Sequence, residues 1–414
     1  MTYGLIGEKL GHSFSKIIHE RLAEFPYELR ELAPTELGEF LRNEPFRGIN
    51  VTIPYKQAVI PYLDELAPSA ELTGAVNVIV RSEDGRLTGH NTDYDGVLAM
   101  AGRAGVDFSG ASVVILGAGG ASRAVAAAAK DAGAAKVVFA VRHDFGPGRL
   151  PVSDPSTFAD CEVLVNATPV GMCPNVSGKP LDISVLPKLR GVLDCVYNPI
   201  RTELVLDAQE RGIPAAGGLM MLVAQAVRAS ELFLDKTYPE EVVDEMYRFL
   251  LCSRRNIVLC GMPSSGKTTI GKEVAARLGM PFTDTDDVIR THSGMEIPDI
   301  FAQEGEAGFR KRESIAIESV AGEQGFVIAT GGGAVLDPSN VRALKRNGII
   351  FFVDRSPVLL EPTEDRPLSR TRSAIGRLYE QRLPGYLAAA DARIPNDGNL
   401  TDTVESIIRH AQQG

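Results

Sequence analysis

Two separate units in the sequence each place an apolar strand, a glycine-rich turn and a helix in direct succession, at residues 112–130 and 256–278. Each unit can present backbone N–H groups at a helix N-terminus, where a phosphate group binds favourably. A single domain seldom needs two phosphate cradles of this kind. The sequence therefore predicts two nucleotide sites on two α/β folds with mainly parallel sheets.

Length and composition agree with several folded domains. The chain has 414 residues, 44% of them hydrophobic, and a net charge of −10. These values predict two or three folding units with real cores, and the acidic balance argues against a nucleic-acid partner. The five cysteines show neither a C-x-x-C pair nor zinc-ligand spacing, which favours reduced, mostly buried thiols.

The sequence also bears on location. The first apolar stretch, Tyr3–Gly7, is too short for a signal peptide. No apolar run reaches the roughly 20 residues that span a bilayer. We therefore expect a soluble cytoplasmic protein without a membrane partner, and an oligomer is compatible with the sequence.

The order of elements divides the chain into several parts. Residues 1–103 together with 218–251 are expected to form one lobe, because the helical stretch after Gly218 can fold back onto the first hundred residues. Residues 104–217 have the pattern of a dinucleotide-binding domain. Residues 252–255 are expected to be a short linker, and residues 256–414 a P-loop domain.

The first glycine-rich turn follows the apolar strand Val113–Leu116. It contains the small residues that a pyrophosphate needs at close range, namely Gly117, Gly119, Gly120 and Ala121. Such a turn can also be purely structural, so the next strand is informative. That strand ends at Arg142, with Asp144 nearby, where NAD sites usually have an acidic residue. An arginine there favours the 2′-phosphate of NADP.

Four polar motifs occur at probable strand ends in the first hundred residues: Gly11–Ser15, Asn50–Lys56, Gly74–Asn77 and Gly89–Asp93. Together they describe a pocket for a small polyhydroxylated acid. Lys56 can donate a proton to the oxygen of a carbonyl whose carbon accepts a hydride, and Asp93 can orient the ammonium. A single Lys or Asp is more often a solvated surface residue, but these two lie within polar clusters.

These motifs, in this order, resemble the shikimate dehydrogenase family from Tyr3 to about Leu234, with further matches at Asn166–Met172, Val196–Pro199 and Gly218–Gln225. The resemblance implies that Lys56 and Asp93 are the catalytic pair. The substrate contacts that it implies are Ser13, Ser15, Asn50, Thr52, Asn77, Asn91, Tyr197 and Gln225. At the family's Asn-Arg-Thr clamp for the adenosine phosphate this chain has Val-Arg-His, so that only Arg142 matches.

The second glycine-rich turn, residues 261–268, matches G-x-x-x-x-G-K-[ST] between a strand and a helix. In such a loop backbone N–H groups surround the phosphates, the lysine reaches the outer phosphates and the last hydroxyl binds Mg²⁺. The predicted nucleotide contacts are Gly261, Ser264, Ser265, Gly266, Lys267, Thr268 and Thr269.

Charged residues downstream of this loop suggest an acceptor and a metal. Asp284 and Asp286 alternate after a short strand, so one can face the metal and the other an acceptor hydroxyl; a solvated acidic turn is the alternative. Arg310 and Arg382 are among several separated arginines that can hold a carboxylate or neutralise a transferring phosphoryl group.

As an ordered set these residues resemble shikimate kinase over about Asn256 to Ile408. The resemblance implies that shikimate is bound by Asp286, Arg310, Gly332, Gly333 and Arg382 in a pocket lined by Phe301 and Phe309. It also implies that Thr268 and Asp284 serve Mg²⁺, that Lys267 and Asp286 are catalytic, and that Arg366 reaches ATP from a mobile lid. The lid at residues 364–382 is short, and no residue matches the family's adenine-stacking arginine.

The resulting fold prediction is α/β: a two-lobed dehydrogenase with a Rossmann-type NADP domain, followed by a P-loop NTPase-type kinase domain. The expected activity is bifunctional, in aromatic amino acid (chorismate) biosynthesis. The first part reduces 3-dehydroshikimate to shikimate with NADPH, and the second phosphorylates shikimate to shikimate 3-phosphate with MgATP.

Two alternatives stay open at this point. One is an NAD-dependent quinate or shikimate dehydrogenase fused to another small-molecule kinase. The other is a non-catalytic metabolite sensor built from both folds. The sensor predicts the loss of reactive residues, whereas Lys56, Asp93, Lys267, Thr268 and Asp286 are all present.

Overall fold

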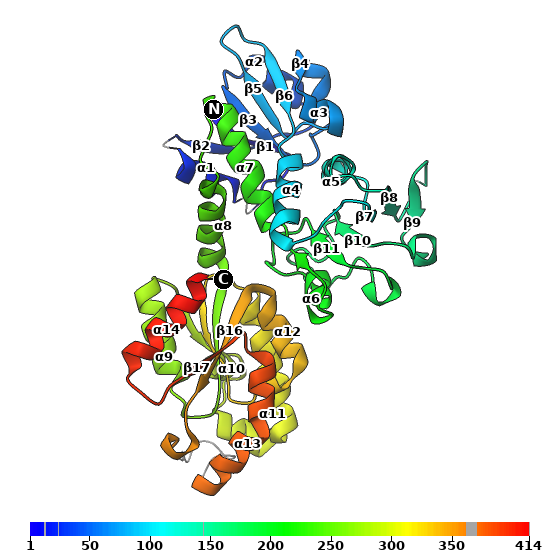
Figure 1. Ribbon diagram of the computed structural model, residues 1–414. Helices are drawn as coiled ribbons and strands as arrows, with labels where there is room; N and C mark the ends of the chain where they lie inside the picture. Colours follow the sequence, from blue (N-terminus) through cyan, green and yellow to red (C-terminus); the bar gives the residue numbers. More distant parts are fainter. Residues whose placement is uncertain (12–13, 24, 144, 362–370, 414) are drawn as a thin grey trace. The chain divides into compact units, whose positions relative to one another are not determined.

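The computed structural model describes residues 1–11, 14–23, 25–143, 145–361 and 371–413. The chain forms two compact units, Met1–Tyr247 and Arg248–Gly414. The helices and strands of each unit carry their labels in Figure 1. The three sheets of the two units confirm the predicted α/β class, with parallel pairing throughout two of them.

The first sheet of unit 1 is mixed and has the order β2-β1-β3-β5-β6-β4. Its strands are β1 (Tyr3–Gly7), β2 (Tyr27–Glu31), β3 (Gly48–Val51), β4 (Glu65–Leu66), β5 (Val78–Arg81) and β6 (Leu87–His90). The helical segments of this region are α1 (Ser15–Leu22), α2 (Leu37–Asn43), η1 (Ile60–Tyr62) and α3 (Pro68–Thr73). Strand β3 pairs in parallel with β1 and antiparallel with β5, so it is a central strand of the sheet.

The second sheet of unit 1 has the order β12-β11-β10-β7-β8-β9 and is parallel throughout. Its strands are β7 (Ser112–Leu116), β8 (Lys136–Val141), β9 (Arg149–Pro151), β10 (Val163–Asn166), β11 (Gly191–Asp194) and β12 (Ala215–Ala216). The accompanying helical segments are α4 (Asp93–Ala104), α5 (Gly120–Asp131), η2 (Pro155–Phe158), η3 (Ile183–Val185), α6 (Glu203–Glu210) and α7 (Leu219–Leu234).

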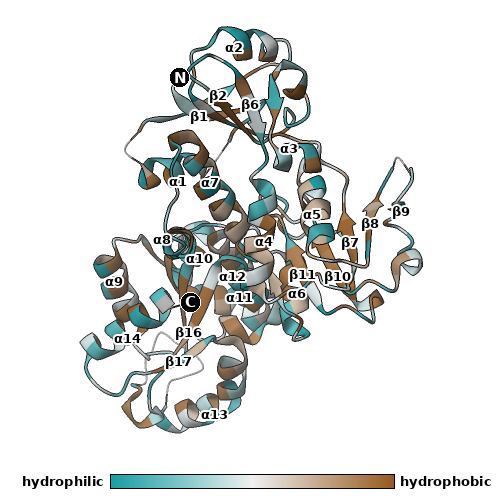
Figure 2. Cartoon of the chain, turned by 45° about the horizontal axis from the view of Figure 1, so that its top comes forward, coloured by the Kyte–Doolittle hydropathy of each residue, from teal (hydrophilic) through white to brown (hydrophobic). Residues whose placement is uncertain are grey.

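Strand β7 shows why this second sheet is buried on both faces. Val113 and Ile115 belong to one apolar cluster, while Val114 and Leu116 belong to another on the opposite face. Alternate residues of a strand point to opposite faces, so an unbroken apolar run suits a sheet that is covered on both sides. The hydrophobic colour along β7, β10 and β11 in Figure 2 follows this pattern.

Unit 2 contains a five-stranded parallel sheet in the order β14-β15-β13-β16-β17. Its strands are β13 (Asn256–Cys260), β14 (Phe282–Asp284), β15 (Val327–Ala329), β16 (Gly348–Asp354) and β17 (Ala392–Pro395). Its helical segments are α9 (Lys267–Leu278), α10 (Thr285–Ser293), α11 (Ile297–Ala321), η4 (Ala334–Leu336), α12 (Pro338–Asn347), η5 (Pro357–Leu359), α13 (Arg372–Ala389) and α14 (Leu400–Gln413).

The same alternation organises unit 2. Ile257 and Leu259 of β13 pack in a cluster that also contains residues of α9 and α14. Val258 and Cys260 pack in a cluster with residues of α11, α12 and α13. Figure 1 shows α9 and α14 on one side of this sheet and α11 and α12 on the other.

The segment between the two predicted halves differs from a free linker. Helix α8 runs from Glu241 to Arg254, so Cys252, Ser253 and Arg254 form its last turn. Strand β13 begins at Asn256, directly after Arg255. The backbone oxygen of Arg254 accepts a hydrogen bond from Gly325 N, a partner that local sequence could not reveal.

Among the helices in the described ranges, none combines the length and the apolar character that crossing a membrane requires.

Candidate active sites

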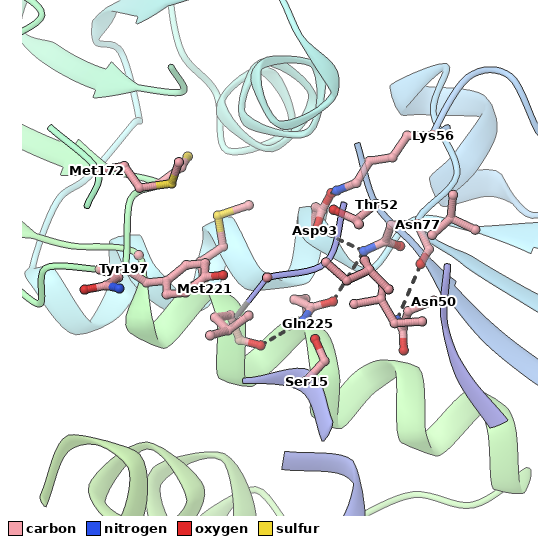
Figure 3. Close-up of a pocket in the computed structure, with 18 of the residues that line it drawn as sticks. Ser15, Asn50, Thr52, Lys56, Asn77, Asp93, Met172, Tyr197, Met221 and Gln225 are labelled. Atoms are coloured by element: carbon pink, nitrogen blue, oxygen red, sulfur yellow. Dashed lines mark hydrogen bonds and ion pairs between the residues drawn. The ribbon is translucent and has the colours of Figure 1, made fainter. Parts of the chain in front are cut away.

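Unit 1 contains a cavity of about 590 Å³ between the ends of its first sheet, helix α7 and the loops that follow β10 and β11. Residues from seven separate segments of the chain meet in its wall. Eight of the expected substrate and catalytic residues line it: Ser15, Asn50, Thr52, Lys56, Asn77, Asp93, Tyr197 and Gln225. In Figure 3, Met172 and Tyr197 lie at one end of this pocket and Lys56, Asp93 and Asn77 at the other.

Lys56 and Asp93 form the most direct polar contact in this cavity. The Lys56 ammonium donates to Asp93 Oδ2 over 2.5 Å, and Asn77 Nδ2 donates to Asp93 Oδ1 over 2.9 Å. Asp93 is the first residue of α4, where the positive end of the helix dipole favours a carboxylate. The contacts hold the Lys56 side chain beside the Asp93 carboxyl group on the cavity wall, which is the arrangement that a proton donor needs.

Amide side chains continue this network towards the rest of the cavity. Asn77 Nδ2 also lies 3.5 Å from Gln225 Oε1, and Gln225 Nε2 donates to the backbone oxygen of Leu222 over 2.9 Å. Burial raises the pKa of the Tyr197 hydroxyl, so Tyr197 stays a neutral donor at physiological pH. The wall therefore offers several neutral hydrogen-bonding groups together with the ammonium groups of Lys9 and Lys56, which suit a small polyhydroxylated acid.

Of the other two expected substrate contacts, Ser13 lies outside the described residues, and Asn91 is not among the residues of this wall. Asn91 is fully buried behind the wall, where its Nδ2 donates to the backbone oxygen of Ala75 and its Oδ1 accepts from Asp93 N. The side chain of Asn91 is thus occupied in fixing the start of α4, and it supports Asp93 from within the protein.

Other lining residues were not predicted. Met172 and Met221 lie in motifs that the sequence analysis quoted, but apolar side chains carry no polar signal that would single them out. Tyr27, which does not itself line the cavity, was missed as well, although its hydroxyl donates to Asn50 Oδ1 over 2.6 Å. The two residues are 23 positions apart, so only the folded sheet brings them together.

The first glycine-rich turn lies next to Lys56. A Cβ atom on Gly120 would lie 3.2 Å from Lys56 Cδ, and one on Gly117, whose φ is +99°, would lie 2.9 Å from Thr168 Cγ2. Gly119 is the N-cap of α5, so free N–H groups point out of this turn. Arg142 follows directly after β8 and is exposed. Asp144 lies outside the described residues.

In unit 2, the second glycine-rich turn has the local geometry of a phosphate cradle. Gly261 has a φ of +143°, and a Cβ atom there would lie only 2.5 Å from the backbone oxygen of Val353. Lys267 is buried, and its ammonium donates to the backbone oxygens of Gly261 and Met262 over 3.1 and 2.7 Å. The loop thus holds a buried cation beside the N-terminus of α9.

Thr268 and Asp284 form an oxygen-rich pair beside this loop. Thr268 Oγ1 donates to Asp284 Oδ2 over 2.8 Å, and Asp284 Oδ1 accepts from Asp286 N over 3.0 Å. A hydroxyl and a carboxylate are oxygen ligands of the kind Mg²⁺ prefers, and Mg²⁺ usually keeps several waters. The two side chains therefore fit a Mg²⁺ ion that is held through few protein ligands.

The predicted acceptor residues gather around the loop Gly331–Gly333. A Cβ atom on Gly333 would lie 2.4 Å from Arg310 Nη1, and one on Gly331 would lie 3.1 Å from Asp286 Oδ1. Arg382 Nη1 donates to the backbone oxygen of Gly332 over 2.9 Å. Nearby, Phe301 and Phe309 stack with their ring centroids 4.6 Å apart.

Arg310 is held by two carboxylates. Its Nη1 lies 2.5 Å from Glu313 Oε2 and its Nη2 lies 3.1 Å from Glu306 Oε1. Glu313 is 1% exposed, and burial raises the pKa of its carboxyl while Arg310 lowers it. The sequence analysis included Glu313 in a motif but gave it no role. Arg366 and most of the expected lid lie outside the described residues, and α13 begins at Arg372.

Two families of known proteins match separate parts of the chain. The family described as shikimate dehydrogenase substrate binding domain matches residues 5–79, and the family described as shikimate kinase matches residues 263–412. A protein of Clostridium perfringens named shikimate dehydrogenase (NADP(+)) is 36% identical over 265 residues, covering 59% of this chain and 97% of its own length.

Solved structures extend the comparison to the fold of the first unit. Shikimate dehydrogenase 1 from Peptoclostridium difficile is 34% identical with a TM-score of 0.55, covering 60% of this chain and 98% of its own. Quinate dehydrogenase from Corynebacterium glutamicum, solved in complex with NAD, is 33% identical with a TM-score of 0.53, covering 61% and 98%.

Proposed function

We propose that this chain, which belongs to the shikimate dehydrogenase family and carries a shikimate kinase domain, reduces 3-dehydroshikimate with NADPH and phosphorylates the resulting shikimate with MgATP. The two family matches support both enzymatic activities on one chain, in the shikimate pathway. The cofactors, the direction and the roles of single residues are the additional content of the proposal.

The contact between Lys56 and Asp93 is the observation that carries the dehydrogenase part. Bound NADPH supplies the hydride that reaches the carbonyl carbon of the substrate. Lys56 donates a proton to the carbonyl oxygen, and Asp93, 2.5 Å away, keeps the ammonium aligned. Gly120 approaches Lys56 closely, so a dinucleotide on this turn lies next to the proton donor. The remaining polar wall residues, among them Ser15, Asn50, Thr52 and Gln225, bind the acid and its hydroxyls.

The kinase part rests on the charges around the second turn. ATP and Mg²⁺, when bound, supply the phosphoryl group and neutralise its oxygens. Lys267 holds a fixed positive charge at the phosphates, and Thr268 with Asp284 holds the metal. Asp286 accepts the hydrogen bond of the acceptor hydroxyl, while Arg310 and Arg382 bind the shikimate carboxylate across the Gly331–Gly333 loop.

NADP preference rests on Arg142 and on the absence of an acidic residue at that position. The NAD complex of the similar quinate dehydrogenase keeps the alternative cofactor and substrate relevant. Initial rates with 3-dehydroshikimate and either NADPH or NADH, and with quinate and NAD, separate the two interpretations. Faster turnover with NADH, or with quinate, would contradict the proposal.

One reaction mixture tests both activities. Intact protein is incubated with 3-dehydroshikimate, NADPH and MgATP, and shikimate 3-phosphate, ADP and NADP⁺ are measured. We expect all three products in equal amounts. Lys56→Ala is expected to form no product unless shikimate is added, and Lys267→Ala to stop at shikimate. Binding of both nucleotides without turnover would instead support the sensor.

A further inference from the structure

A buried aromatic pair lies behind the wall of the dehydrogenase cavity. The Tyr27 hydroxyl donates to Asn50 Oδ1 over 2.6 Å, and both side chains are buried. The imidazole ring of His19 stacks on the Tyr27 ring, with the ring centroids 4.3 Å apart and the planes at 8°. Neither Tyr27 nor His19 lines the cavity, whereas Asn50 does.

The hydrogen bond from Tyr27 decides which end of the Asn50 amide is free. An asparagine side chain has one acceptor oxygen and one NH₂ donor. Tyr27 occupies the oxygen, while the contact of Nδ2 with the backbone oxygen of Asn77 is 3.4 Å long and therefore weak. Asn50 consequently presents an N–H donor to the cavity, which suits a hydroxyl or carboxylate oxygen of the substrate.

His19 acts on this pair through packing. It is fully buried, and its imidazole interacts with the Asn50 side chain, although neither ring nitrogen makes a hydrogen bond of standard geometry among the described residues. Burial lowers the pKa of the imidazole to about 3, so the ring is neutral at physiological pH. His19 lies one helical turn after Ser15 in α1, on the same face of the helix. The stacked ring thus joins the helix that carries Ser15 to the tyrosine that orients Asn50.

We propose that Tyr27 is a positioning residue of the dehydrogenase, which fixes the Asn50 amide with its N–H donor towards the substrate, and that His19 holds Tyr27 in place. This inference rests on the proposed function, because it takes Asn50 as a substrate contact. Tyr27 acts only through Asn50, so its removal should affect substrate binding and leave cofactor binding and the chemical step unchanged.

A double-mutant cycle with Tyr27→Phe and Asn50→Ala tests the proposal in the oxidation of shikimate by NADP⁺. Tyr27→Phe removes one buried hydrogen bond and frees the amide to rotate. We expect the KM for shikimate to rise by roughly 5–30-fold, with kcat and the KM for NADP⁺ within about 2-fold of the wild type. In the Asn50→Ala background, Tyr27→Phe should cause no further rise in KM.

Tyr3→Phe is the matched control. Tyr3 belongs to the same buried cluster as Tyr27, but its hydroxyl lies 3.4 Å from a different partner, the backbone oxygen of Phe233. It should leave the KM for shikimate within about 2-fold, whatever its effect on the melting temperature. His19→Phe keeps the stacking and should behave like the wild type, whereas His19→Ala should raise the KM.

Several outcomes overturn the inference. It is wrong if Tyr27→Phe leaves KM unchanged, or raises it equally in the Asn50→Ala background. If Asn50→Ala itself has no effect on KM, the proposed substrate contact fails and the inference fails with it. If Asn50→Ala raises KM and Tyr27→Phe does not, the proposed function stands and only the positioning role falls. Should Tyr27→Phe not fold, the comparison of His19→Ala with His19→Phe decides, and equal KM values refute the role.

Discussion

In the proposed function each unit uses a lysine, Lys56 or Lys267, and the two lysines lie in different surroundings. Lys56 contacts the carboxylate of Asp93 on the wall of an open cavity, 2.5 Å away. Lys267 is buried and donates to two backbone oxygens of its own loop. Reduction of a carbonyl creates an oxygen that needs a proton, whereas transfer of a phosphoryl group needs a lasting positive charge. The surroundings of each lysine match these separate demands.

The two glycine-rich turns also differ in where the lysine beside them comes from. At the first turn, Gly120 leaves room for Lys56, so a cofactor bound at this turn would lie beside a lysine that comes from another part of unit 1. At the second turn, Gly261 leaves room for the backbone of Val353, and the cation, Lys267, belongs to the turn itself. The kinase turn therefore contains its own charge, while the dehydrogenase turn depends on a lysine outside it.

The largest effect is expected for Lys267→Ala. The transferring phosphoryl group would lose its fixed cation, and kinase turnover should fall by about 10³-fold or more. Dehydrogenase turnover should stay within about 2-fold, because Lys56 supplies the proton there. ADP release with added shikimate and NADPH consumption with 3-dehydroshikimate measure the two activities separately. A kinase rate above a tenth of the wild type would show that the loop does not need this charge.

Lys56→Ala should reduce dehydrogenase turnover by about 10²–10⁴-fold while kinase turnover stays normal. Lys56→Arg sharpens the comparison, because arginine keeps the charge but does not release a proton at physiological pH. We expect the arginine variant to be nearly as slow as the alanine variant. If Lys56→Arg restored the rate, charge alone would be sufficient and the proposed contrast between the two lysines would disappear.

Arg310→Ala should weaken shikimate binding at the kinase site by roughly 10–100-fold, because a carboxylate loses a charge-assisted partner. Glu313, which is buried, would also lose the cation that lowers its pKa. Arg312→Ala is the control, since Arg312 lies on the same helix and pairs with the half-exposed Glu304. The KM for shikimate in the ADP-release assay, which reports on the kinase site alone, should separate the two variants. Equal affinities would remove Arg310 from the binding site.

Arg142→Ala should raise the KM for NADPH by about 10-fold and change the KM for NADH little, because only NADPH carries the 2′-phosphate. Lys136→Ala removes an exposed cation from the start of the same strand, where it pairs with Asp160, and serves as control. Initial rates over a range of concentrations of each cofactor give the KM values of both variants for NADPH and for NADH. A similar rise for NADH would assign Arg142 a structural role.

Features that depend on local backbone could be predicted from the sequence. Two apolar strands, Val113–Leu116 and Ile257–Cys260, are each followed by glycines and a helix. Their conformation depends only on neighbouring residues, and the structure contains both strand–turn–helix segments. Eight motif residues from distant segments line one cavity, because polar groups at the ends of adjacent strands meet at one edge of a sheet.

Features that depend on distant partners could not be predicted. Asn91 stands in a polar motif like its neighbours, yet its amide is bound to Ala75 and Asp93 inside the protein. Tyr27 reaches Asn50 from another strand of the same sheet, and Glu313 is buried only because α11 packs beside the Gly331–Gly333 loop. Residues 252–254 look like a charged linker but continue α8, where Arg254 meets Gly325.

The smallest effect is expected from separating the two enzymes, if both fragments keep helix α8. Val243 and Tyr247, in its first half, pack against the core of unit 1, where Tyr247 lies under the Arg103 guanidinium at 3.9 Å. Arg254 and Arg255, at its end, bind Gly325 and Ala411 within unit 2. A cut inside the helix would remove one set of these contacts.

Fragments 1–255 and 241–414 duplicate the helix and retain both sets. Each fragment keeps its own nucleotide turn and its own acceptor residues, so we expect two folded proteins whose kcat and KM values lie within about 2-fold of the intact chain.

The shikimate made by the dehydrogenase should reach the kinase through solution, both in the intact chain and in the mixed fragments. Intact protein is therefore given 3-dehydroshikimate, NADPH, MgATP and excess isotope-labelled shikimate. We expect the label to enter shikimate 3-phosphate in proportion to its share of total shikimate, as it should with the mixed fragments. Exclusion of label by the intact chain alone would mean that the intermediate is passed on directly, and that the two units cooperate in a way that separate sites do not require.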